Sequence, residues 1–235
     1  MTTQLLPGQH SGTAINDASA PRWYGLYPAV VSDNQDPDQQ GRVKVRLPWT
    51  PDGSSAYDAW ARVATTMAGG DRGTWFVPEV DDEVLIGFGG GNPDHPYVVG
   101  ALWNGVDSPP QSMDTDNNVK AIVSREDIRI TLDDTAGAVT LKLETPGGQS
   151  ITLADRGSTI TFEDSNGNSL ELAPGNITLT AATKLTISAA SIDINAPMVN
   201  VDSAMWKYTG VIQNDTLITN SVVSLAYTPG AGNVW

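Results

Sequence analysis

Adjacent carboxylates are the residues of this 235-residue sequence that most obviously suggest acid–base chemistry. They occur at Asp81-Asp82-Glu83 and again at Asp133-Asp134. Catalysis by two carboxyl groups requires a fixed separation across a cleft, and burial that raises the pKa of one of them. Neighbouring acids within one loop are instead typical of solvated turns. We therefore predict no catalytic residue and do not expect an enzyme.

Metal and phosphate binding have little support in the sequence. Cysteine is absent and the only histidines are His10 and His95, so no metal-ligand motif is present. Residues 87–91 are glycine-rich and follow a predicted strand, as a phosphate loop does, but no Lys-Ser or Lys-Thr pair and no helix follows them. We expect a barrel turn there, and we assign no metal site and no cofactor.

Charge and the lengths of the apolar runs argue against two further classes of partner, nucleic acids and membranes. Thirteen basic residues stand against 27 acidic ones, a net charge of −14, whereas nucleic-acid binding depends on cationic side chains. No apolar run reaches the roughly 18 residues of a membrane span, so we expect no stable membrane insertion. Residues 1–7 lack the charged and apolar regions of a signal peptide, so we expect assembly in the cytoplasm.

The elements available to position any of these groups are short β-strands. Between residues 127 and 204 an apolar–polar–apolar unit recurs, with a spacing that shortens along the chain to a seven-residue interval. This alternation is typical of strands with one buried face. The apolar positions, which we predict to form a shared core, are Ile128, Ile130, Val139, Leu141, Ile151, Leu153, Ile160, Phe162, Leu170, Leu172, Ile177, Leu179, Leu185, Ile187, Ile192, Ile194, Val199 and Val201.

One such strand buries little apolar surface, so the units must share a core. We favour a homotrimer in which three copies intertwine as a β-helix, or triangular β-prism, because this pools the apolar faces and pairs most free strand edges. A single-chain β-helix of about three coils and an ordinary β-sandwich are the alternatives that the repeat leaves open.

A different pattern precedes the repeats. Residues 22–107 contain about five strand-like segments and no helix pattern, which suggests a small closed barrel of the OB type. The predicted strands cover 23–31, 42–47, 60–64, 83–88 and 97–103. Residues 108–126 are polar and contain Pro109-Pro110, so we expect a linker there. Residues 1–21 are expected to form an extended arm or a disordered leader.

The barrel segment resembles a known family. Residues 41–49 (GRVKVRLPW), 60–64 (WARVA), 76–86 (FVPEVDDEVLI) and 91–100 (GNPDHPYVVG) are similar in order and spacing to the OB domain of phage baseplate assembly protein V, gp5 and VgrG. These are central spikes of contractile tails and contractile injection systems. The resemblance implies an all-β chain, with an N-terminal OB-fold barrel followed by a trimeric intertwined β-helix stalk.

The resemblance also implies partners. The hub domain fused upstream in VgrG is missing, which implies a separate, gp27-like hub protein of the baseplate. Related spikes carry a His-x-His iron site at the apex, but this sequence has no histidine after His95, so that site does not transfer. An axial ion held by carboxylates of three chains stays unassigned. The aromatic residues of 205–235 are a candidate seat for a PAAR-type tip protein, and they are Trp206, Tyr208, Tyr227 and Trp235.

We therefore predict a structural spike of a phage virion tail or a related particle, which docks on a hub through its OB domain and pierces an envelope mechanically when the sheath contracts. The first alternative is a binding module, in which the OB barrel recognises carbohydrate or protein and is displayed on a β-stalk. The second is an envelope-degrading enzyme, for which the carboxylates give no support.

Overall fold

The computed structural model describes residues 22–49, 57–221 and 223–224 of the chain. It divides into two units, Met1–Thr183 and Lys184–Trp235. All regular elements of the described part are β-strands except the 3-10 turn η1 (Gly89–Gly91). No described helix has the length and apolar character needed to cross a bilayer. The prediction of an all-β chain is confirmed.

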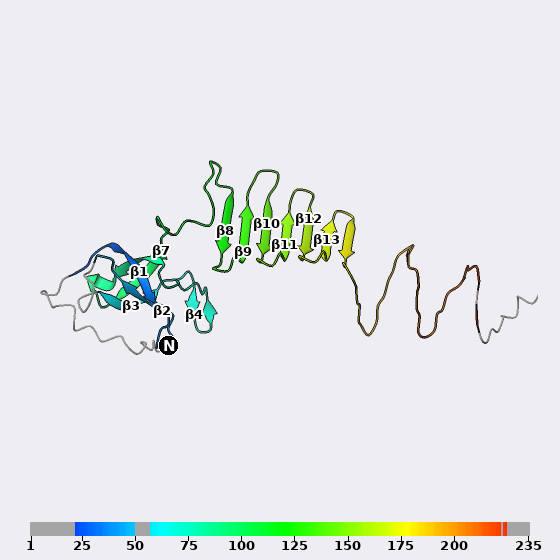
Figure 1. Ribbon diagram of the computed structural model, residues 1–235, viewed down its shortest axis with the longest axis horizontal. Coiled ribbons are helices and arrows are strands. Elements are labelled where there is room, and N and C mark those ends of the chain that lie inside the picture. Colours follow the sequence, from blue (N-terminus) through cyan, green and yellow to red (C-terminus); the bar gives the residue numbers. More distant parts are fainter. Residues whose placement is uncertain (1–21, 50–56, 222, 225–235) are drawn as a thin grey trace, which may run out of the picture. The chain divides into compact units, whose positions relative to one another are not determined.

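The first part of unit 1 is a closed five-stranded barrel, which confirms the predicted OB fold (Figure 1). Its strands pair in the order β1-β2-β3-β7-β6, and a short parallel pair between β3 and β7 closes the barrel. The strands are β1 (Leu26–Asp33), β2 (Arg42–Arg46), β3 (Asp58–Val63), β6 (Glu83–Phe88) and β7 (Pro96–Ala101).

Small aliphatic side chains fill the barrel because alternate residues of each strand point inwards. Ala29 and Val31 of β1, Val43 and Val45 of β2 and Ile86 of β6 are fully buried. A second, aromatic cluster packs beside this core. It contains Trp23, Tyr27, Trp49, Tyr57 and Phe88, whose neighbouring rings lie 5.1–6.3 Å apart in tilted or edge-on contacts. The short hairpin of β4 (Ala68–Gly69) and β5 (Arg72–Gly73) lies outside the barrel sheet.

The second part of unit 1 is a seven-stranded antiparallel meander in which each strand pairs with its neighbour in sequence (Figure 1). The sheet begins inside the segment predicted to be a linker, because Val119–Val123 forms its first strand. The strands are β8 (Val119–Val123), β9 (Arg129–Asp133), β10 (Thr140–Glu144), β11 (Ser150–Ala154), β12 (Thr159–Glu163), β13 (Ser169–Ala173) and β14 (Asn176–Thr180).

Unit 2 contains no strand in its described residues 184–221, 223 and 224. The last three predicted repeat units fall here, and their apolar side chains, from Leu185 to Val201, are all exposed. A strand exists only when its backbone groups pair with a second strand. β13 and β14 have the same seven-residue interval, from Leu170 to Ile177, but they turn through Pro174-Gly175, whereas no glycine separates the later units.

Candidate trimer interface

The meander has one apolar face, which the strand register defines. Residues paired across antiparallel strands lie on the same face of a sheet, as do residues two apart within a strand. Two rows of side chains therefore run across all seven strands on this face. The first row is Ile122, Ile130, Leu143, Ile151, Phe162, Leu170 and Leu179; the second is Lys120, Leu132, Leu141, Leu153, Ile160, Leu172 and Ile177.

The opposite face is polar. Its central row contains four threonines with one lysine and one glutamate, and its only apolar member is the small Ala121 of β8. In order from β8 to β14 the row is Ala121, Thr131, Lys142, Thr152, Thr161, Glu171 and Thr178. Threonine suits a solvent-facing strand position because it is β-branched and its hydroxyl tolerates water. The sheet thus has one face for water and one for burial.

Nothing in the described chain covers the apolar face. Leu153 and Ile160 near its middle are 39% and 37% exposed, and Ile177 at the β14 edge is 70% exposed. A groove runs along the first row, and its lining includes the first-row residue of each strand from β9 to β14: Ile130, Leu143, Ile151, Phe162, Leu170 and Leu179. An apolar strip of this length normally marks an interface.

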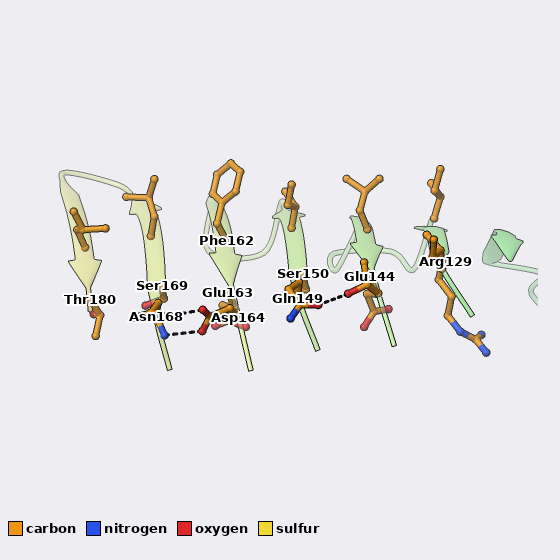
Figure 2. Close-up of a pocket in the computed structure, with 17 residues that line it drawn as sticks. Arg129, Glu144, Gln149, Ser150, Phe162, Glu163, Asp164, Asn168, Ser169 and Thr180 are labelled. Atoms are coloured by element: carbon orange, nitrogen blue, oxygen red, sulfur yellow. Dashed lines mark hydrogen bonds between the residues drawn. The ribbon is translucent and has the colours of Figure 1, made fainter. Parts of the chain in front are cut away.

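Polar residues at the strand ends form one edge of this groove (Figure 2). The Asp164 carboxylate accepts hydrogen bonds from Asn168 Nδ2 at 2.7 Å and from the backbone amides of Asn166 and Asn168 at 2.9 Å each. These bonds, led by that of the Asn168 side chain, lower the pKa of Asp164 to about 2. The turn between β12 and β13 is thereby fixed by a charged group.

Comparison with known families finds one match over the barrel and one over the repeat segment. Residues 27–103 match the injector OB domain of type VI secretion systems and phage baseplates. Residues 140–206 match the C-terminal trimerisation domain of phage baseplate V. The two matches belong to one kind of protein, stand in the predicted order and together cover more than half of the chain. The chain belongs to the phage baseplate V and VgrG spike family.

Curated relatives of this family are much longer proteins. The type VI secretion system spike protein VgrG2a of Pseudomonas aeruginosa is 31% identical over 122 residues, which are 48% of this chain and 14% of VgrG2a. The spike protein VgrG3 of Vibrio cholerae is 34% identical over 91 residues, 38% of this chain and 9% of VgrG3. The actin cross-linking toxin VgrG1 of V. cholerae is 30% identical over 91 residues, 38% of this chain and 8% of the toxin. This chain therefore spans only a small part of each relative.

The structure brings most of the predicted core residues of the apolar–polar–apolar repeat together on one sheet face. From Ile130 to Leu179, all of them except Val139 lie in the two apolar rows. Ile128 and Val139 come one residue before β9 and β10, and both are partly exposed. The prediction omitted Ile122, Leu132 and Leu143, which occupy the same rows. For the last two the signal was present in the sequence, because the alternation continues one step beyond each predicted unit.

The two residues of the candidate tip seat that the structure describes are exposed. Trp206 and Tyr208 are 61% and 58% exposed in the chain, and their contact with a tip protein stays a prediction. Tyr227 and Trp235 lie outside the described residues. Trp206 and Tyr208 stand seven residues after Val199 and Val201, the same interval that separates the three preceding units.

The carboxylates and histidine considered first have structural contacts. Asp82 accepts a hydrogen bond from the Glu79 amide at 2.8 Å, and Asp133 accepts two from Thr135. His95 Nδ1 lies 3.5 Å from Asn92 Nδ2 in the turn before β7. No group of three or more metal-ligating side chains is found among the described residues.

Proposed function

We propose that this chain forms the homotrimeric central spike of a contractile injection machine, a rigid needle that docks on a hub protein through its OB barrel and pierces an envelope when the sheath contracts. One observation supports this function most. The trimerisation domain presents a continuous apolar face that the described part of its own chain leaves uncovered.

The energetics favour three copies over one. Burial of a leucine, isoleucine or phenylalanine contributes about 1.5–3 kcal/mol per side chain, and the two rows hold such residues at every position except Lys120. A lone sheet leaves seven of these thirteen side chains 37–70% exposed and so forgoes part of that stabilisation. Three meanders around one axis would place the rows against each other and leave the threonine face in solvent.

The same arrangement explains unit 2. Its backbone has no strand partner within the described chain, and backbone N–H and C=O groups require partners when they are buried. Copies wound around each other supply those partners between chains. Such a stalk resists bending and cannot unravel one chain at a time, which suits a mechanical role.

The partners follow from this role. A separate hub protein would receive the barrel, and a separate PAAR-type tip protein would close the far end of the stalk. We propose no catalysis on the target. The carboxylates considered above serve as turn and ion-pair groups, and within the described residues they do not face each other across a cleft.

The mass in solution tests the proposal. Light scattering at micromolar concentration is expected to give three times the 24.9 kDa of one chain. Mixing with the sheath, tube and hub proteins of the same particle is then expected to give tails that carry the spike. A folded species with the mass of a single chain would contradict the trimer. A trimer that binds glycan arrays but never enters tails would contradict the spike.

A further inference from the structure

The apolar face of the meander extends beyond the matched trimerisation domain. That match begins at residue 140, at the start of β10. The register carries both rows further, onto β9 and β8. Ile130 pairs with Leu143 and Ile122 pairs with Ile130, while Leu132 pairs with Leu141. Ile122 and Leu132 are 50% and 45% exposed, as uncovered as the rows within the match.

The face ends at a charged residue. Lys120 occupies the second row on β8, opposite Leu132. Its Nζ lies 2.8 Å from Asp134 Oδ2 and donates to the carbonyl oxygen of Asn117 at 2.7 Å. An ammonium group held by these acceptors would be costly to strip of water. The boundary between buried and solvated surface is therefore expected between Ile122 and Lys120.

We propose that the interface between copies of this chain begins at β8, so that Ile122, Ile130 and Leu132 pack against a neighbouring copy and Lys120 marks the edge of the contact. This rests on the proposed trimer. The occupant is a second copy because the same two rows run without a break into the domain that trimerises. A different partner would have to share one flat sheet face with the neighbouring copies.

The absence of cysteine makes single-cysteine variants a direct test. We would prepare the full chain as Ile122→Cys, with Leu153→Cys as a buried reference inside the matched domain and Glu171→Cys as an exposed reference on the opposite face. Each change is small, and each variant's mass is measured before use. The readout is the rate at which a maleimide labels the thiol in the native protein, with labelling in denaturant as the full signal.

In a trimer, Ile122→Cys is expected to label at least about tenfold more slowly than Glu171→Cys, and at a rate like that of Leu153→Cys. Fast labelling of Ile122→Cys beside slow labelling of Leu153→Cys would overturn this inference and leave the trimer standing. Fast labelling of both in a species with the mass of one chain would overturn the proposed function itself. Slow labelling of Ile122→Cys in such a single-chain species would mean that the chain covers its own face, which also contradicts the inference.

Discussion

Arg42 at the start of β2 forms an ion pair with Asp36 in the preceding loop, with Nη2 and Oδ1 2.6 Å apart. The Asp36 side chain is only 4% exposed. Its carboxylate also accepts hydrogen bonds from the backbone amides of Gln40 and Arg42, at 2.8 and 3.2 Å. The Arg42 guanidinium, with help from these amides, lowers the pKa of Asp36 far below its ordinary value. One carboxylate with little exposure thus ties residues 38–42 of the β1–β2 loop to the start of β2.

Asp36→Asn is therefore expected to destabilise the barrel by about 1–3 kcal/mol, because the amide supplies donors where the loop needs acceptors and removes the less exposed of Arg42's two carboxylate partners. Urea unfolding of the full chain, followed by tryptophan fluorescence, measures the loss. Asp38→Asn is the control, since Asp38 also contacts Arg42 but is 58% exposed, and it should cost no more than about 1 kcal/mol. Equal effects of the two changes would contradict the role given to Asp36.

Acid is expected to loosen the turn at Asp164. Its pKa falls from 3.8 in the unfolded chain to about 2 in the fold. A lowered pKa stabilises the fold fully above the unfolded value, and this contribution is lost as pH falls from about 4 towards 2. Melting temperatures between pH 5 and 2 should therefore fall less steeply for Asp164→Asn than for the unchanged protein. Parallel curves would show that Asp164 does not carry this part of the acid sensitivity.

Gly41 has a backbone that only glycine adopts at low cost. Its φ is +72°, and an added Cβ would lie 2.9 Å from Cζ3 of Trp75. Gly41→Ala is expected to cost about 1–2 kcal/mol in the free energy of unfolding, or more if the indole cannot shift. Gly100→Ala on β7 is the matched control, because open space surrounds that position, and it should be nearly neutral. The same urea titration compares the two variants, and a neutral Gly41→Ala would refute the argument.

The repeat pattern predicts most strands of the stalk, but it does not show which strands pair with each other. Alternation identified the strands from Ile130 to Leu179 because each unit places two apolar residues on one face. It missed β8, where Lys120 replaces an apolar residue and Ile122 is the single apolar member of the strand in the rows. Only the pairing of Ile122 with Ile130 reveals the strand. The barrel was predicted well because residues 42–47 alternate without a break and the other strands are short apolar runs between turn residues. The Asp36–Arg42 pair depends on a loop path that no periodicity encodes.

The seven-residue interval makes a prediction for the end of the repeat. Leu185, Ile192 and Val199 begin successive units, and Trp206 begins a fourth at the same interval. The matched trimerisation domain ends at this residue. If the interval sets which side chains meet between copies, Trp206 and Tyr208 lie inside the stalk and are not a free seat for a tip protein.

Trp206→Ala is then expected to lower the melting temperature of the trimer by several degrees or more, because truncation of a buried tryptophan costs about 3–5 kcal/mol per copy. Lys207→Ala, which changes the intervening residue on the opposite face, should leave that temperature almost unchanged. Circular dichroism of the full chain at fixed concentration measures both variants. If Trp206→Ala melts like the unchanged trimer but no longer binds the tip protein, the tryptophan is the seat first predicted, and the repeat ends at Val201.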